Sequence, residues 1–241
     1  MCEDNKRSGC FYGVGVGPGD PELITLKSAR LIERAKVVCY LVNIEGDSQS
    51  RTIARQHLVA GHLEMPIYMP MSEDPAIGSA VYDEAAVAIK QQLGEGKDVV
   101  FLCEGDPLFF GSFAYLLTRI QDDYPCEVIP GIASPHGASA KLKKPLTMLK
   151  ESYGVISGRH SDEEIRQALL TLDSLVIMKA GRARPKILKL LNETNRLHQA
   201  NYLEYIGREN ECIVEDVSTL AHEAGPYFSL FIVLRDERGR S

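Results

Sequence analysis

The fold is indicated by the stretch Phe11-Tyr12-Gly13-Val14-Gly15-Val16-Gly17-Pro18-Gly19-Asp20-Pro21-Glu22. Its first seven residues predict a buried strand that ends in a glycine-rich turn. Asp20 suits a helix N-cap, Pro21 suits the first helical position, and Glu22 favours the positive end of the helix dipole. The stretch therefore predicts a strand, a tight turn and a helix, the repeating unit of an α/β sheet.

The glycines at positions 13, 15, 17 and 19 suggest a dinucleotide-binding loop, but that pattern is broken. It requires a third glycine three residues after the second, where this sequence has Pro18 or Asp20. The next predicted strand, Val37 to Val42, ends without the acidic residue that would hold a ribose. The phosphate-binding loop is absent as well, because Gly96-Lys97 is followed by Asp98. An ordinary strand-to-helix turn stays open as an interpretation of the glycines.

Apolar segments alternate with helix-period segments through the first 130 residues. This alternation predicts a mostly parallel, doubly wound sheet in a first lobe, residues 1–130. The predicted strands are 11–17, 37–42, 63–68, 99–103 and 127–129, and the main predicted helices are 50–58, 80–93 and 107–120.

The pattern changes in residues 131–241, for which we expect a second α/β lobe. After a small-residue helix at 133–140 the predicted strands are 153–157, 175–179, 201–206, 211–217 and 228–234, with helices at 162–170 and 184–196. The last strands follow one another without helices between them. They therefore predict a mixed sheet with antiparallel pairs.

Composition limits the classes of protein. Of 241 residues, 44% are hydrophobic and 25% are charged, which is typical of a globular chain. The net charge of −6 argues against a nucleic-acid partner. The longest apolar runs are too short to span a bilayer, and Met1 to Gly9 lacks the apolar core of a signal peptide. Six cysteines without a C-x-x-C pair argue against zinc or disulfides. We therefore expect a cytoplasmic protein without a membrane partner or a bound metal.

Two further glycine turns follow predicted strands. One is Glu104-Gly105-Asp106-Pro107 and the other is Pro130-Gly131-Ile132-Ala133-Ser134. Taken alone, Gly-Asp-Pro is more often a helix cap than a binding site. Ligands of open α/β sheets lie beyond the carboxyl ends of the strands, so we expect all three turns to border one crevice.

These motifs carry a family resemblance over essentially the whole chain. Val14 to Leu26 resembles the N-terminal signature of the tetrapyrrole (corrin and porphyrin precursor) methylases, and the other two turns match that family's second and third motifs in order. Within the family, the insert Glu64 to Asp74 and the stretch Gly105 to Ser112 most resemble the C-20 methyltransferases of cobalamin synthesis. Those enzymes act on precorrin-2 or its cobalt complex, and the resemblance slightly favours the cobalt form.

The resemblance implies a homodimer of two-lobed subunits with S-adenosylmethionine bound between the lobes and S-adenosylhomocysteine as its product. Ala133 stands where many relatives have threonine, so only a backbone contact is expected there. Carried over by motif, the cofactor-binding residues are Pro18, Glu104, Gly105, Asp106, Phe109, Ala133, Ser134, Met178, Ile206 and Gly207.

The implied reaction is an in-line attack by a carbon nucleophile on a sulfonium methyl group. It requires neither a protein nucleophile nor a metal, and positioning supplies on the order of 7–11 kcal/mol. Glu104 and Asp106 are candidates for a base, with a structural cap as the other interpretation of Asp106. The carboxylates of a tetrapyrrole would need cationic partners, although a solvated basic segment is an equal interpretation. The candidates are Lys141, Lys143, Lys144, Lys150 and Arg159.

Four alternatives stay open at this point. One is methylation at another corrin position, and another is a diphthine synthase or ribosomal RNA methylase of the same fold. An RNA methylase should show a basic face, which the composition does not indicate. The third is a non-catalytic tetrapyrrole-binding protein, and the fourth is a nicotinamide-dependent oxidoreductase, which the broken glycine pattern disfavours.

Overall fold

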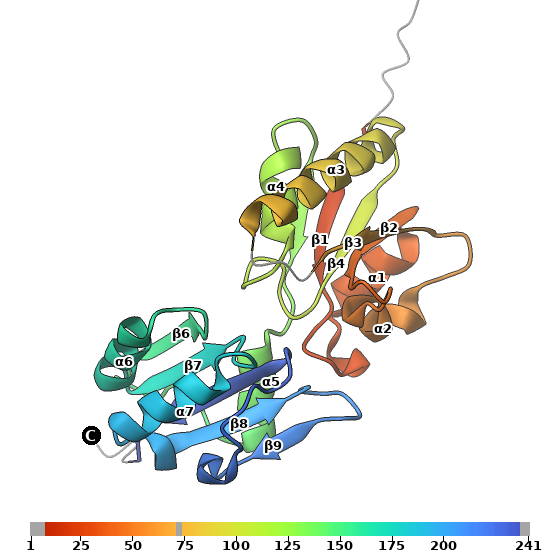
Figure 1. Cartoon of the computed structure of the whole chain (residues 1–241). Helices are drawn as coiled ribbons and strands as arrows, with labels where there is room; N and C mark the ends of the chain where they lie inside the picture. The colour runs from red at the N-terminus through yellow and green to blue at the C-terminus, as the bar shows by residue number, and fades with distance from the viewer. Residues whose placement is uncertain (1–7, 71–73, 237–241) are drawn as a thin grey trace, which may run out of the picture. The chain divides into compact units, whose positions relative to one another are not determined.

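A computed structural model describes residues 8–70 and 74–236 of the chain (Figure 1). The expectations for Cys2, for most of the N-terminal segment and for Met71 in the insert fall outside these residues. Two compact units are present, the first ending at Ala133 and the second beginning at Ser134. Within the described ranges, none of the helices is both long and apolar enough to cross a membrane.

The first unit is built on a five-stranded sheet in the order β3-β2-β4-β1-β5, and all four strand pairs are parallel. The parallel sheet predicted for this part of the chain is confirmed. Its strands are β1 (Phe11–Gly15), β2 (Val37–Val42), β3 (Leu63–Tyr68), β4 (Val99–Cys103) and β5 (Cys126–Ile129). Its helices are α1 (Leu26–Arg34), α2 (Gln49–Ala54), α3 (Pro75–Gly94) and α4 (Phe113–Ile120).

Helices cover both faces of this sheet, as Figure 1 shows. Strand β4 is buried along its whole length, which explains why its sequence is apolar at every position instead of alternating. Phe101 and Phe113 belong to the core under α3 and α4, whereas Leu102 and Ile32 belong to the core under α1 and α2. The sheet is therefore doubly wound, and its strand ends are free to carry turns.

The second unit contains a mixed sheet in the order β6-β7-β10-β8-β9. Strands β6 and β7 are parallel, and the remaining three pairs are antiparallel, as predicted. Helices α6 and α7 contribute to the core on one face, and α5 contributes to the core on the other. The elements are α5 (Ser134–Leu142), β6 (Tyr153–Ser157), α6 (Asp162–Thr171), β7 (Ser174–Met178), α7 (Arg184–Glu193), β8 (Ala200–Glu204), β9 (Cys212–Val214) and β10 (Ser229–Leu234).

Two helices begin later than their sequences predict. Apolar periodicity predicts a helix from Pro107, but α4 begins at Phe113. Phe110 has φ of +55°, a left-handed conformation that interrupts a right-handed helix. Likewise Asp20 caps only a 3₁₀ turn, and α1 begins after Thr25, whose hydroxyl accepts a hydrogen bond from a backbone N–H. Both delays lengthen the turns that follow β4 and β1.

Candidate functional site

The first two glycine turns are joined by backbone hydrogen bonds at the carboxyl ends of β1 and β4. The Gly105 amide donates to the Gly17 carbonyl at 2.8 Å, and the Gly17 amide donates to the Gly105 carbonyl at 3.4 Å. One residue earlier, the Val16 amide donates to the Cys103 carbonyl at 2.9 Å. The chain therefore continues pairing beyond the regular strands, which holds these turns side by side.

Asp106 connects the third turn to the second. Its Oδ2 accepts a hydrogen bond from the Gly131 amide at 3.1 Å, and its Oδ1 accepts one from the Leu108 amide at 2.9 Å. The sequence suggested that Asp106 caps the following helix, but that interpretation is wrong because α4 begins only at Phe113. The carboxylate instead fixes its own turn and links it to a turn 25 residues further along the chain.

The three turns approach each other so closely that side chains would not fit between them. A Cβ on Gly15 would lie 2.6 Å from the Gly131 Cα, and a Cβ on Gly131 would overlap the Gly105 carbonyl oxygen. Gly17 and Gly105 have φ of +82° and +66°, conformations that only glycine adopts readily. Backbone atoms thus form the contact between the turns, and we call these joined turns (residues 15–19, 104–107 and 130–133) the glycine rim.

The glycine rim brings together several residues predicted to bind the cofactor. Pro18, Gly105 and Ala133 are buried within it, whereas Glu104 and Asp106 are half-buried. Phe109 follows the second turn, and its ring packs edge-on against Phe110 at 5.1 Å between centroids. Ser134 comes directly after the rim and begins α5 in the second unit.

The remaining predicted cofactor residues lie at one edge of the second sheet. Met178 ends β7, while Ile206 and Gly207 follow the end of β8. The amide of Gly207 donates to the carboxylate of Glu211 at 2.6 Å, which fixes a turn whose glycine has φ of +75°. All three residues therefore lie at the edge of the sheet where β7 and β8 end, and β10 runs between those two strands.

Two of the basic residues predicted to meet the substrate have carboxylate partners within the second unit. Lys141 pairs with Glu211 at 3.1 Å, and Lys144 lies 3.5 Å from a carboxylate oxygen of Glu215. The Lys144 amine also donates to the Asn201 side chain at 3.0 Å. Both lysines thus bind residues of β8 or of the chain on either side of β9. Lys141 is exposed despite its ion pair, as are Lys143, Lys150 and Arg159.

Lys179, which directly follows β7, is a second cation near Arg159, and the sequence did not predict it as a site residue. Burial and the charge of Arg159 both lower the pKa of the Lys179 amine. Lys179 also has φ of +54°, an uncommon conformation for a residue with a Cβ. A lysine at the end of a predicted strand was the only available sequence signal.

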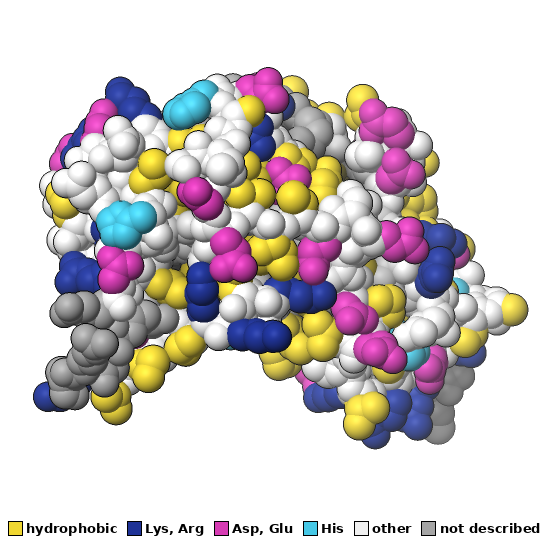
Figure 2. Space-filling model, turned by 90° about the horizontal axis from the view of Figure 1, so that it is seen from below, with side chains coloured by type: hydrophobic (Ala, Val, Ile, Leu, Met, Phe, Trp, Pro, Cys, Tyr) yellow, Lys and Arg dark blue, Asp and Glu magenta, His cyan; other side chains and the backbone are white. Residues whose placement is uncertain are grey.

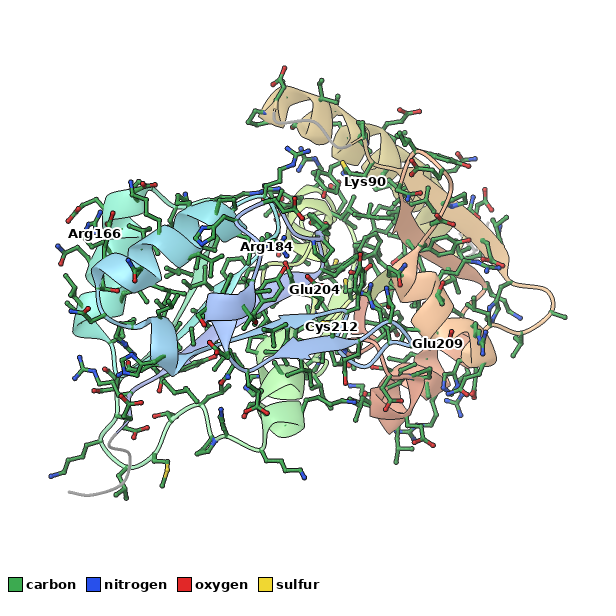
Figure 3. All side chains as sticks on the ribbon, turned by 60° about the horizontal axis from the view of Figure 1, so that its bottom comes forward. Lys90, Arg166, Arg184, Glu204, Glu209 and Cys212 are labelled. Carbon is green, nitrogen blue, oxygen red and sulfur yellow. The ribbon has the colours of Figure 1, made fainter. Side chains whose placement is uncertain are left out.

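A buried arginine was also missed. Arg184 begins α7, and Figure 3 shows its side chain near that of Glu204 at the end of β8. Their charged groups are 3.6 Å apart. In the sequence, the position of Arg184 directly before Pro185 indicates only the start of a helix, because the local pattern does not reveal partners on β8 or beyond.

In the part of the chain that the structure describes, no three His, Cys, Asp or Glu side chains gather as a group that could hold a metal ion. Cys39 and Cys103 lie inside the first core, and burial raises the pKa of both thiols. Cys103 ends β4 directly before the glycine rim, where it acts as a small apolar side chain.

A doubly wound parallel sheet with a backbone-lined rim, followed by a mixed sheet, defines a two-unit α/β protein. The family model of the Tetrapyrrole (Corrin/Porphyrin) Methylases matches residues 10–221. The chain therefore belongs to this family, as the resemblance of the three motifs predicted.

Individual relatives cover nearly the full chain. The precorrin-2 C(20)-methyltransferase of Sinorhizobium sp is 34% identical over 93% of this chain and 95% of its own length. The cobalt-precorrin-2 C(20)-methyltransferase of Salmonella typhimurium (strain LT2) is 34% identical over 94% and 96%. Among solved structures, the uroporphyrin-III C-methyl transferase of Thermus thermophilus complexed with S-adenyl homocysteine is 26% identical, with a TM-score of 0.66 over 94% and 98% of the two chains.

Proposed function

We propose that this protein transfers a methyl group from S-adenosylmethionine to C-20 of precorrin-2 or its cobalt complex. The observation that carries the proposal is the 34% identity to two C(20)-methyltransferases, each over more than nine-tenths of both chains. Matches to methyltransferases named for other positions are weaker, such as 29% over 65% of this chain for a cobalt-precorrin-4 C(11)-methyltransferase.

The glycine rim fits the chemistry of the proposed cofactor. S-adenosylmethionine carries a cationic sulfonium, an ammonium and a carboxylate, and it supplies an electrophilic methyl group when bound. The rim provides backbone amides and carbonyls together with the acidic side chain of Glu104. We propose that Pro18, Glu104, Gly105 and Ala133 contact the cofactor there, and that Ser134, Phe109, Met178, Ile206 and Gly207 complete its site.

We assign Asp106 a positioning role within this site. Both of its carboxylate oxygens already accept backbone hydrogen bonds, so its side chain acts by holding the second and third turns together. A rim that is rigid before the ligand binds needs little reorganisation during the reaction. Positioning of this kind contributes on the order of 7–11 kcal/mol to a two-reactant step, which makes a protein nucleophile unnecessary.

We propose that the carboxylates of the tetrapyrrole bind exposed basic residues of the second unit, with Lys150 and Arg159 as the first candidates. Lys141 and Lys144 are weaker candidates because their amines already have carboxylate partners. Acidic and basic side chains are interspersed on the face shown in Figure 2. This mixture favours a small anionic substrate over the broad phosphate backbone of an RNA.

The test is an anaerobic incubation with S-adenosylmethionine labelled in its methyl group and with either precorrin-2 or cobalt-precorrin-2. We expect label in the tetrapyrrole, at C-20 by NMR, and comparison of the two turnover rates identifies the preferred substrate. Binding of both ligands without transfer would instead support a non-catalytic tetrapyrrole-binding protein. Absence of any affinity for S-adenosylmethionine would overturn the proposal.

We also propose that the protein is a cytoplasmic homodimer, as the family resemblance implies. Light scattering after size-exclusion chromatography should give a mass about twice the 26.7 kDa of one chain. A mass of one chain at micromolar concentration would contradict the proposed dimer without affecting the proposed chemistry.

A further inference from the structure

The side chain of Arg184 ties together two segments that are distant in sequence. It is 8% exposed, and its Nε donates to the Glu223 carbonyl at 2.7 Å while its Nη2 donates to the Ala224 carbonyl at 3.3 Å. Nη1 lies 3.6 Å from the Glu204 carboxylate, and the guanidinium lies 5.7 Å from the centre of the Tyr202 ring. One planar group thus connects the start of α7, the end of β8 and the segment that leads into β10.

The segment held by Arg184, residues 223–228, lies between predicted cofactor residues. Strand β10 pairs with β7 on one side, where Leu230 is opposite Met178, and with β8 on the other, where Ser229 is opposite Glu204. The segment therefore enters the sheet at the edge where β7 and β8 end. Met178 lies to one side of it, and the turn after Glu204 lies to the other.

Close packing makes the position of this segment dependent on Arg184. The Gly225 amide donates to the Gly181 carbonyl at 2.9 Å. A Cβ on Gly181 would lie 2.8 Å from the Gly225 carbonyl oxygen, and a Cβ on Gly225 would lie 3.0 Å from Nη1 of Arg184. Glycine at both positions lets the segment lie directly against the turn before α7. The guanidinium then holds two consecutive carbonyls at once, a geometry that a lysine amine does not reproduce.

We propose that Arg184 is a positioning residue for the methyl donor. By fixing residues 223–228 at the strand edge beside Met178, it sets the affinity for S-adenosylmethionine without touching the reacting atoms. The inference rests on the proposed function, because it takes Met178 and Ile206 as cofactor contacts. A solely structural role would lower the stability of the fold and leave the affinity of the folded protein unchanged.

Arg196 is a matched control for this proposal. It is 6% exposed, and it also holds backbone carbonyls, those of Leu169, Leu172 and Asp173, at 2.6 to 3.1 Å. Asp173 directly precedes β7, so Arg196 acts at the opposite end of that strand from Met178. Arg184→Met and Arg196→Met therefore remove similar buried groups from the two edges of one sheet.

The experiment measures binding of S-adenosylhomocysteine to the full-length variants by isothermal titration calorimetry, with thermal melts alongside. We expect both substitutions to lower the melting temperature. Only Arg184→Met should raise Kd, by about tenfold. Arg184→Lys should be intermediate, and for both Arg184 variants the KM for S-adenosylmethionine should rise with little change in kcat.

Gly225→Ala keeps the arginine but displaces the segment, so it should also weaken binding and serves if Arg184→Met does not fold. An unchanged Kd in Arg184→Lys and Gly225→Ala, or an equal loss in Arg196→Met, would overturn the positioning role. Failure of the unaltered protein to bind S-adenosylhomocysteine would instead overturn the proposed function itself.

Discussion

At the scale of single residues, the glycine rim depends on positions where even one methyl group would not fit. Gly131→Ala places a Cβ onto the Gly105 carbonyl oxygen, so the third turn must move away from the second. Overpacking of this kind costs about 1–3 kcal/mol. We expect a lower free energy of unfolding in urea and a clear loss of affinity for S-adenosylhomocysteine.

The control for that substitution is Gly78→Ala. Gly78 lies in α3, and a Cβ there would meet no atom within 4 Å. Alanine should leave ligand binding unchanged and stabilise the helix by up to about 1 kcal/mol. Normal binding by Gly131→Ala would show that the contact between the turns is unimportant for the site.

Asp106 offers a second test at this scale, because one carboxylate joins two of the turns. Asp106→Ala removes acceptors from the amides of Leu108 and Gly131, at a cost of about 1–3 kcal/mol. Asp106→Asn keeps one acceptor oxygen and should lose less of both stability and methyl transfer. Equal effects of the two substitutions, by urea unfolding and label transfer, would contradict a role based on these two hydrogen bonds.

The cysteines provide a test of burial. The raised pKa values of Cys39 and Cys103 mean that both thiols stay protonated at pH 8, and the protonated form is unreactive. Cys212 is exposed and should be alkylated first among the five described cysteines. Peptide mapping after timed iodoacetamide treatment measures the order, and early labelling of Cys39 or Cys103 in folded protein would contradict the packing described here.

At the scale of elements, an ion pair fastens the edge strand β3 to its neighbours. Arg51 of α2 donates to both Glu64 oxygens, at 2.6 and 3.0 Å, and Tyr40 of β2 donates to the same carboxylate at 2.5 Å. These contacts lower the pKa of Glu64 to about 2 from its ordinary 4.5, and the hydrogen bond from Arg51 makes the largest contribution. The carboxylate therefore links β3, β2 and α2.

The sign of the resulting pH dependence follows from that shift. A carboxyl group with a lowered pKa in the folded state stabilises the fold above pH 4.5, and this contribution disappears as the pH falls toward 2. Because both charged groups are partly exposed, we expect only about 1 kcal/mol. Urea unfolding of Glu64→Gln and of the unaltered protein should differ at pH 7 and converge near pH 2. A constant difference across that range would contradict this assignment.

Helix boundaries show where local patterns reach their limit. Phe109, Phe113, Leu116 and Ile120 have helical spacing, so a helix from Pro107 was predicted, yet the helix begins at Phe113. A Cβ on Gly111 would lie 2.5 Å from the Pro107 carbonyl oxygen, and Phe110 is left-handed. The chain folds back tightly over the second turn, which periodicity does not encode.

At the scale of the whole molecule, ligand binding should stabilise the folded chain. A ligand that binds only the native state at 100 times its Kd adds about 2.7 kcal/mol to the free energy of unfolding. Thermal melts with increasing S-adenosylhomocysteine should therefore shift upward with the logarithm of its concentration. NADPH should give no shift, and a shift with NADPH alone would favour the oxidoreductase alternative.

The sequence by itself determined the order of the elements, the parallel first sheet, the mixed second sheet and the family. Each of these follows from apolar periodicity or from motifs only a few residues long, such as Gly105-Asp106-Pro107. Local sequence carries this information because strand and helix periods repeat within one element.

Only the tertiary structure decided which groups meet. In the folded chain Asp106 accepts a hydrogen bond from Gly131, Lys141 forms an ion pair with Glu211, and Arg184 donates to the carbonyl of Glu223. These partners are 25 to 70 residues apart, and packing of whole sheets brings them together. The charge of a lysine or an arginine can be read from the sequence alone. Which group pairs with it depends on how distant strands are ordered in the sheet.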